Sequence, residues 1–325
     1  MGHRMDILVV KLGALGDVIN TLPLVVQLKN HFQANIHWLV APLSYPIVSK
    51  HPYVDQTILF EKSNWRSSIM EVKKAIRSQR FDLVLDLQRI LKSTTLCMLA
   101  KSSRRIGFDR KRCKEMTWLF PFERIPESDP SAHMLLQYLE FSAYLGVKKD
   151  APITWEISAS PNRPDILPDN YVVLNVGATK PANRWTVQGF ASLADSIADE
   201  VSASCVITGG KEDQEMARQI ESMSTARLLN LTGRTTIEEL TNILQHARAV
   251  VTCDTGPMHL AVALGKEVIA LFGPSDPRRT GPFTGHVIQK NLDCAPCNQK
   301  ACEAPLCMSE IRSTDVMEKL KTLLK

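Results

Sequence analysis

The sequence has no apolar run long enough to cross a membrane as a helix. Its longest apolar runs, such as Val268–Phe272, are far shorter than the roughly 20 residues that a bilayer-spanning helix needs. The polar amino terminus, Met1–Asp6, lacks the apolar core of a secretory signal peptide, so we do not expect export. With 44% hydrophobic and 22% charged residues, the composition is that of a soluble globular protein.

The motifs of two common nucleotide-binding loops are also missing. After the apolar run Ile7–Val10, the turn at residues 13–17 reads GALGD and lacks the third glycine of the dinucleotide motif G-x-G-x-x-G. No Gly-Lys-Ser/Thr follows this turn, which excludes a P-loop. The sequence therefore argues against an NAD-dependent nucleotide-sugar epimerase.

No RNA- or DNA-binding motif accompanies the densely basic segment Lys101–Lys114. The net charge of +5 is mild, so the clustering of these charges says more than their sum. One interpretation is a solvated face, and the other is a docking surface for an anionic partner. We expect no nucleic acid among the partners.

Strand-like runs alternate with helix-like segments twice along the chain, before and after the proline-rich stretch Ser160–Asn170. In the first half, Ile69, Val72 and Ile76 share one face of a predicted helix. Such alternation is typical of a parallel sheet covered by helices on both faces. We predict two Rossmann-like lobes, residues 1–158 and 159–325, whose sheets face a central cleft and whose ligands lie beyond the carboxyl ends of the strands.

The turn at residues 13–17 ends in Asp17, at the start of a predicted helix. Asp17 either caps this helix, where a negative charge is favourable, or acts as a general base that takes a proton from an acceptor hydroxyl. Gly13 and Gly16 would let the acceptor approach the turn closely.

Two further motifs follow strand-like runs in the second half. Thr179, Lys180, Asn183 and Arg184 lie in a small-residue turn whose N–H groups and cations suit a phosphate group; a basic surface loop is the alternative. A pair of glycines precedes Glu212, which offers a carboxylate for ribose hydroxyls; a plain turn is the alternative there.

A fourth motif contains Asp254, Thr255, Gly256, Pro257 and His259. The first two are candidates to cap a helix that begins near the proline. Its N-terminus would present N–H donors and a positive dipole to an anion, with the histidine as a further donor. The alternative is a capped helix with an incidental histidine.

Seven segments together resemble glycosyltransferase family 9, the ADP-heptose:lipopolysaccharide heptosyltransferases, from about Asp6 to Phe283. In chain order they are GALGDVINTLP (13–23), DLQRILKS (86–93), RRIGF (104–108), GATKPANRW (177–185), LTGRTTIEEL (231–240), DTGPMHLAVALG (254–265) and ALFGPSDP (270–277).

The resemblance implies an α/β protein with a GT-B fold and an inverting, metal-independent transfer of heptose from ADP-heptose to the inner core of lipopolysaccharide, on Kdo-lipid A or a heptosyl acceptor. The N-terminal lobe would bind the acceptor and the C-terminal lobe the nucleotide sugar, with Asp17 as the base and no cofactor for catalysis. The donor-site positions are Thr179, Lys180, Asn183, Arg184, Glu212, Asp254, Thr255, Gly256, Pro257 and His259. The acceptor-site positions are Gly13, Gly16, Lys92, Arg104 and Arg105.

One position departs from the family pattern. Many relatives carry lysine where this chain has Asn183, which supplies a hydrogen bond but no charge, so we expect Lys180 to substitute. An anionic glycolipid acceptor would place the enzyme in the cytoplasm, as a monomer held peripherally at the inner face of the membrane. The alternatives are another nucleotide-sugar donor, a protein acceptor, or a non-catalytic glycolipid-binding scaffold.

Four of the eight cysteines are clustered as C-x2-C-x4-C-x4-C: Cys294, Cys297, Cys302 and Cys307. Four thiols at this spacing suit a closed, structural zinc or iron site. Reduced free thiols and disulfides are the alternatives, and disulfides are disfavoured in a chain without an export signal.

Overall fold

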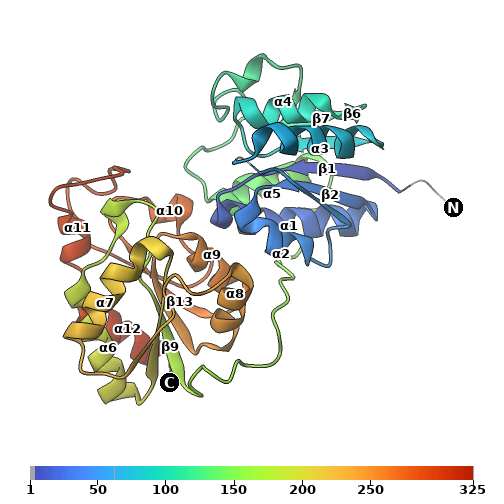
Figure 1. Ribbon diagram of the computed structural model, residues 1–325. Helices are drawn as coiled ribbons and strands as arrows, with labels where there is room; N and C mark the ends of the chain where they lie inside the picture. The colour runs from blue at the N-terminus through green and yellow to red at the C-terminus, as the bar shows by residue number, and fades with distance from the viewer. Residues whose placement is uncertain (1–3, 62, 325) are drawn as a thin grey trace. The chain divides into compact units, whose positions relative to one another are not determined.

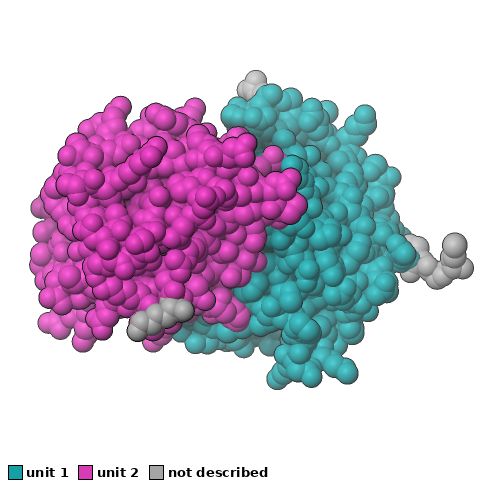
Figure 2. Space-filling view, turned by 90° about the horizontal axis from the view of Figure 1, so that it is seen from below, with its two compact units in different colours: residues 1–158 teal, residues 159–325 magenta. Residues whose placement is uncertain are grey.

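The computed structural model describes residues 4–61 and 63–324 (Figure 1), so Met1–His3 of the polar amino terminus lie outside the described residues. The chain divides into two compact units, residues 1–158 and 159–325, which Figure 2 colours separately. Along the described ranges, no helix combines the length and the apolar character that crossing a membrane requires.

The first unit is built on a six-stranded parallel sheet in the order β3-β2-β1-β5-β7-β8. Its strands are β1 (Asp6–Val10), β2 (Asn35–Val40), β3 (Gln56–Leu59), β5 (Leu83–Asp86), β7 (Arg105–Gly107) and β8 (Glu123–Arg124), and β4 (Arg80–Phe81) pairs with β6 (Lys101–Ser102) separately. Its helices are α1 (Leu15–Phe32), α2 (Tyr45–Ser49), α3 (Trp65–Arg77), α4 (Leu91–Leu99) and α5 (Met134–Tyr144).

Helices cover both faces of this sheet because successive side chains of a strand point to opposite faces. On one face, Leu8 and Val10 of β1 pack in a core cluster with Val72 and Ile76 of α3. Ile7 and Val9 are also fully buried, although they point the other way. A sheet buried on both faces is typical of parallel α/β proteins.

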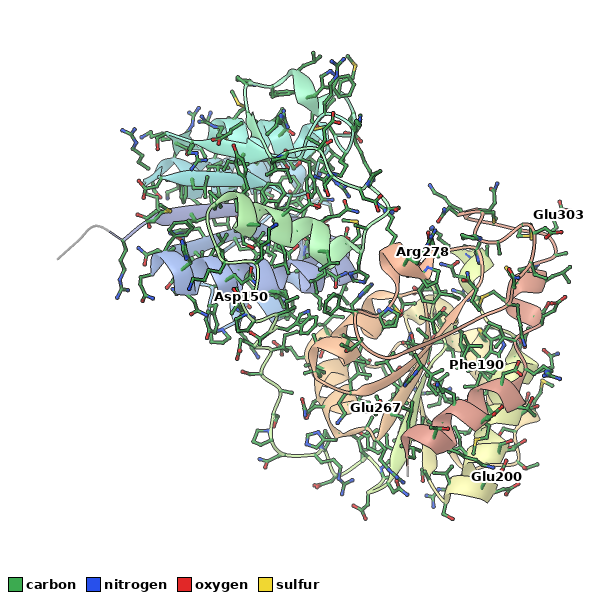
Figure 3. All side chains as sticks on the ribbon, turned by 180° about the vertical axis from the view of Figure 1, so that it is seen from behind. Asp150, Phe190, Glu200, Glu267, Arg278 and Glu303 are labelled. Carbon is green, nitrogen blue, oxygen red and sulfur yellow. The ribbon has the colours of Figure 1, made fainter. Side chains whose placement is uncertain are left out.

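The second unit repeats this plan with the parallel order β11-β10-β9-β12-β13-β14. Its strands are β9 (Tyr171–Asn175), β10 (Ser204–Thr208), β11 (Leu228–Asn230), β12 (Ala249–Cys253), β13 (Glu267–Phe272) and β14 (His286–Gln289). Its helices are α6 (Val187–Val201), α7 (Gln214–Met223), α8 (Ile237–His246), α9 (Gly256–Ala263), α10 (Pro277–Thr280), α11 (Leu306–Ser309) and α12 (Ser313–Leu323). Phe190 of α6, labelled in Figure 3, is buried in the core of this unit.

In each unit the strand order reverses beside the first strand, between β1 and β5 and between β9 and β12. The prediction of two Rossmann-like units with parallel sheets is therefore confirmed. Open parallel sheets bind ligands at such a reversal, beyond the carboxyl ends of the strands.

Candidate active site

Asp17 lies at the point of reversal in the first unit, in the first turn of α1 directly after β1. The N-cap residue of α1 is Ala14, so Asp17 does not occupy the capping position. Its side chain is 34% exposed, and one carboxylate oxygen accepts a hydrogen bond from Lys11 Nζ at 3.0 Å. The carboxylate is thus held by a cation and still open to solvent.

Lys11 is a site residue that the motif analysis missed. Its side chain is only 2% exposed, and its Nζ lies 5.3 Å from the centroid of the Tyr138 ring. Burial lowers the pKa of Lys11, the Asp17 carboxylate opposes that shift, and the positive charges of Arg89 and Lys114 add to it. Arg89 and Lys114 are therefore close enough for their charges to act on Lys11, which itself contacts Asp17. The signal for Lys11 in the sequence was a charged residue at the end of a buried strand.

The turn before Asp17 is fixed by the loop that follows the neighbouring strand β5. Gln88 Oε1 accepts hydrogen bonds from the N–H groups of Leu12 and Gly13, at 3.1 and 3.3 Å. A Cβ atom placed on Gly13 would meet no atom within 4 Å among the described residues, so the space beside this turn is open. A fixed turn with open space next to it suits the approach of an acceptor.

The basic residues predicted for the acceptor site do not share one edge of the sheet. Lys92 lies in the first turn of α4, after the carboxyl end of β5, and its Nζ lies 4.3 Å from the centroid of the Phe60 ring. Arg105 pairs with Val84 at the start of β5, which places it at the opposite edge because all strands are parallel. Arg104 precedes it.

Both of these arginines have structural partners at that edge. A guanidinium N–H of Arg104 donates to Glu123 at 2.6 Å, and Arg105 donates to the carbonyl of Ala100 at 2.5 Å. The structure therefore does not bring Arg104 and Arg105 to Asp17. We correct that part of the predicted acceptor site, because Arg104 and Arg105 lie at the start of β7, at the opposite edge of the sheet from Asp17.

In the second unit, a buried polar cluster joins the carboxyl ends of three strands. Asn175 Nδ2 donates to the hydroxyls of Thr252 and Thr255, at 3.0 and 3.4 Å, and its Oδ1 accepts from Thr208 at 3.3 Å. Thr255 is the N-cap residue of α9, but its hydroxyl bonds with Thr252 at 3.1 Å instead of with the helix. The first-turn N–H groups of α9 are therefore left for an anion.

The other residues of the fourth motif lie in that first turn. Gly256 and Pro257 begin α9, and His259 follows with 8% of its surface exposed. Nearby, Lys180 is half-buried and Thr179 is exposed, so both side chains of the second motif are accessible.

Asn183 links the second and fourth motifs through its side-chain amide. Its Nδ2 donates to Asp254 Oδ2 at 3.3 Å and to Ser275 Oγ at 3.1 Å, and Ser275 donates back at 3.3 Å. Burial raises the pKa of Asp254, and Ser275 and the charge of Lys180 oppose that shift. Asn183 thus positions a carboxylate that lies within reach of the Lys180 charge.

Asp213 is a second residue that the sequence analysis missed. One of its oxygens lies 2.5 Å from a guanidinium nitrogen of Arg184, and the other accepts from the Gly210 N–H at 2.8 Å. A Cβ atom on Gly177 would lie only 2.6 Å from that second oxygen. Asp213 therefore joins two motif loops, the one that contains Gly177 and Arg184 and the one that contains Gly210, whereas the predicted Glu212 is exposed.

The four clustered cysteines lie near the end of the chain. Cys294, Cys297 and Cys302 are exposed and Cys307 is buried. Within residues 4–61 and 63–324, no group of three or more His, Cys, Asp or Glu side chains is arranged to hold a metal ion. The predicted metal site stays a prediction.

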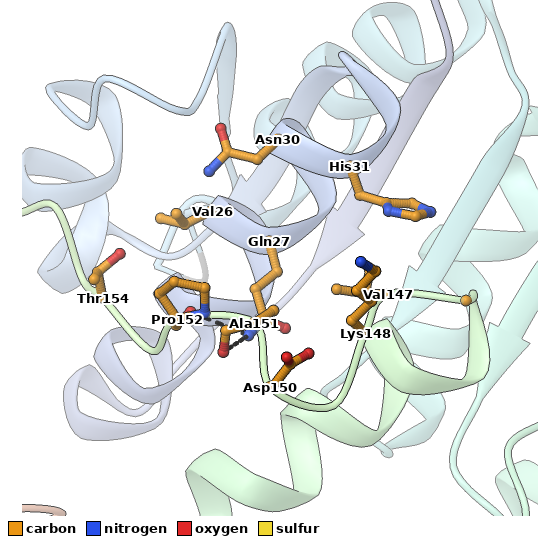
Figure 4. A pocket seen from close by; sticks show the side chains of 11 residues that line it. Val26, Gln27, Asn30, His31, Val147, Lys148, Asp150, Ala151, Pro152 and Thr154 are labelled. Atoms are coloured by element: carbon orange, nitrogen blue, oxygen red, sulfur yellow. Dashed lines mark hydrogen bonds between the residues drawn. The ribbon is translucent and has the colours of Figure 1, made fainter.

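A pocket lies at the far end of α1 from Asp17 (Figure 4). It is lined by Gln27 and His31 of this helix and by the segment 146–154, whose Ala151 and Pro152 carbonyls accept hydrogen bonds from Gln27. About four turns of helix separate Asp17 from His31, so the pocket is distinct from the site at the sheet edge.

The sequence profile of glycosyltransferase family 9 (heptosyltransferase) matches residues 69–307. The lipopolysaccharide core heptosyltransferase OpsX of Haemophilus influenzae is 27% identical over 286 residues, which cover 85% of this chain and 81% of that protein. The solved structure of a family 9 glycosyl transferase from Veillonella parvula has a TM-score of 0.85 at 22% identity, covering 98% of this chain and 97% of its own. The E. coli heptosyltransferase WaaC with ADP has a TM-score of 0.80 at 22% identity, covering 98% and 100%. These likenesses confirm the predicted GT-B fold class.

Proposed function

Because the chain belongs to glycosyltransferase family 9, we propose that it transfers heptose from ADP-heptose to the inner core of lipopolysaccharide, with inversion at the anomeric carbon. The observation that carries this proposal is Asp17, a partly exposed carboxylate held by Lys11 where the strand order reverses. The names of the relatives, which are heptosyltransferases acting on lipopolysaccharide, support the choice of donor and acceptor.

The donor diphosphate would bind at the N-terminus of α9. Cleavage of the anomeric carbon–oxygen bond leaves negative charge on the departing ADP, and N–H donors and a helix dipole aimed at that charge stabilise it. Lys180 adds a positive charge beside Asp254, and Thr179 adds a hydroxyl. The hydrogen bonds of Asn183 fix Asp254 and the loop of Ser275 beside this end of α9.

The acceptor hydroxyl would approach Asp17 from the open side of the Gly13 turn. Its oxygen attacks the anomeric carbon, the bond to ADP breaks, and the hydroxyl proton passes to the Asp17 carboxylate. Lys11 orients that carboxylate from behind. One carboxylate suffices, because the leaving diphosphate needs no protonation by a second acid.

Cations near Asp17 would hold the acidic groups of the acceptor. Arg89 is 8% exposed, and its Nε is one of the buried donors of the described chain that lack a hydrogen-bond partner. Lys114 lies close enough for its charge to affect Lys11, and Lys92 lies at the same edge of the sheet. A carboxylate or phosphate on the acceptor would satisfy the Arg89 donor.

The same edge would contact an anionic membrane surface in the cytoplasm. Large apolar side chains are exposed after the carboxyl ends of four strands, at Leu43, Leu59, Leu91, Met116 and Leu119. Arg110, Lys111 and Lys114 are exposed among them. Apolar and basic side chains on one edge suit binding to the interface of an anionic bilayer.

Acceptor-dependent release of ADP tests the proposal. We expect release from ADP-heptose with a lipopolysaccharide core acceptor, and none without acceptor. Release only with another nucleotide sugar or only with a protein acceptor would contradict the donor or acceptor assigned here, and no release with any pair would support a non-catalytic scaffold. We also propose that the protein is a monomer. Light scattering coupled to size-exclusion chromatography measures the molar mass that tests this.

A further inference from the structure

Three exposed thiols lie close together in one irregular segment of the second unit. The described segment 290–305 contains neither helix nor strand, and it carries Cys294, Cys297 and Cys302 on its surface. Cysteine is among the residue types most often buried, so three exposed cysteines in one short segment are unusual. Figure 3 labels Glu303, which marks this segment at the surface of the unit.

The fourth thiol is fixed against the core. Cys307 is 7% exposed in α11 and packs in the hydrophobic core of the unit. A Cβ atom on Gly273 would lie 2.8 Å from its Sγ, so the thiol rests directly against the loop that follows β13. One thiol is therefore held in place while the other three lie on the adjacent segment.

The three exposed thiols lie near Cys307. Each of Cys294, Cys297 and Cys302 is close enough for its charge to act on Cys307. Thiolates bind a metal ion in place of their protons, so one divalent ion can hold several of them together.

The cysteine segment is also bonded to both loops that flank the proposed diphosphate site. The Asn298 N–H donates to the Pro274 carbonyl at 2.7 Å, next to Ser275. The Ala182 N–H donates to the Lys300 carbonyl at 3.2 Å, next to Asn183. Ser275 and Asn183 bond to each other, so the conformation of the cysteine segment bears directly on that contact.

We propose that Cys294, Cys297, Cys302 and Cys307 bind one zinc or ferrous ion in a closed tetrahedral site that fixes the two donor loops. Four thiolates are the ligands that both ions accept in tetrahedral structural sites, and the two-residue gap between Cys294 and Cys297 is a usual spacing for such ligands. Among the described residues the four thiols are not arranged as a metal-binding group, so the proposal requires the irregular segment to close onto Cys307 when the ion binds. With no open position on the ion, the metal serves structure and not the transfer step.

Metal analysis of the full chain tests the site directly. Protein purified under reducing conditions without chelator is expected to hold about one zinc or iron ion per chain, and exchange into Co²⁺ is expected to give a thiolate-to-cobalt absorption band. Cys294→Ser and Cys302→Ser should each lose most of the metal. Cys113→Ser is the matched control, because Cys113 is a partly exposed thiol outside the cluster, and it should keep the metal.

Metal below about one-tenth of an ion per chain, with no cobalt band, would overturn the proposal, and so would a disulfide within the cluster of freshly purified protein. Equal loss of metal in Cys113→Ser would also overturn it. Elemental analysis of the purified protein distinguishes zinc from iron.

The effect on the donor loops rests on the proposed function and is measured separately. Cys302→Ser should weaken ADP binding by about tenfold, as loss of an outer supporting contact does, while Cys113→Ser leaves it unchanged. Bound metal without any ADP binding would contradict the proposed function and leave the metal site standing. Unchanged ADP binding in metal-free Cys302→Ser would overturn the role assigned to the metal.

Discussion

The Lys11 ammonium lies 3.0 Å from a carboxylate oxygen of Asp17, across the turn that joins β1 to α1. Lys11 is 2% exposed and Asp17 is 34% exposed, so the cation stands behind a carboxylate that opens to solvent. A buried ion pair with one accessible member orients that member while leaving it able to accept a proton. This pair is the feature of the first unit on which the proposed chemistry depends.

The buried carboxyl of Asp254 should make stability depend on pH. Burial raises its pKa above the ordinary value of 3.8, so the folded state binds this proton more tightly than the unfolded state does. The resulting stability is present below pH 3.8 and is lost as pH rises through the raised folded pKa. Asp254→Asn removes the titration and retains an acceptor for Asn183.

We therefore expect the melting temperature of Asp254→Asn to rise relative to that of the unchanged protein as pH increases from about 4 to about 7. Thermal denaturation of both proteins across this range measures the difference. A difference in melting temperature that stays constant with pH would contradict the raised pKa.

Gly177→Ala should destabilise the second unit by about 1–3 kcal/mol, as overpacking does. The added Cβ would lie 2.6 Å from the Asp213 carboxylate and displace it from Arg184 and Gly210. Chemical denaturation measures the cost, and a double-mutant cycle supplies the control. In an Asp213→Ala background the same glycine substitution should cost at least about 0.5 kcal/mol less, whereas equal costs would show that the contact with Asp213 is not the cause.

Lys92 and Arg104 should differ in their effect on the acceptor, because they lie at opposite edges of the sheet. Lys92→Ala should raise the KM for the lipopolysaccharide acceptor by about tenfold, which is the usual loss for one charged contact. Arg104→Ala removes the same charge from the other edge and should change that KM by less than about twofold. An equal rise in both variants would contradict this placement of the acceptor.

Binding to anionic vesicles should depend on the carboxyl edge of the first unit. Arg110→Glu with Lys111→Glu should abolish cosedimentation with phosphatidylglycerol vesicles, and Met116→Ser with Leu119→Ser should weaken it, because both sets are exposed at this edge. Lys101→Glu, which changes an exposed charge in β6 near the other edge, is the control and should retain binding. Loss of binding in all three variants would point to a diffuse charge effect.

The sequence predicts well what depends on neighbours in the chain. Val72 and Ile76, which the spacing of apolar residues placed on one face of a helix, do face the core. The alternation of strand-like and helix-like segments was enough to predict two parallel sheets. The sequence analysis did not identify α5, whose Tyr138 ring lies beside Lys11.

The missed and misplaced site residues depend on contacts that are distant in sequence. Asp213 became part of the site because it meets Arg184 and the Gly177 turn, and nothing in its own segment distinguishes it from Glu212. Arg104 and Arg105 lie in a basic run that spans a strand, so only the register of β7 against β5 decides which end of the run lies near Asp17. Asn183 looked like a weakened phosphate ligand until its bonds to Asp254 and Ser275 gave it a positioning role.

The most direct test of the account is acceptor-dependent ADP release by Asp17→Asn, measured beside calorimetric binding of ADP to the same protein. Asparagine keeps the shape of the side chain but cannot take the hydroxyl proton. We predict that turnover falls by at least about 100-fold while ADP affinity is unchanged, because the base and the diphosphate site lie in different units. Turnover that survives the substitution would contradict Asp17 as the base.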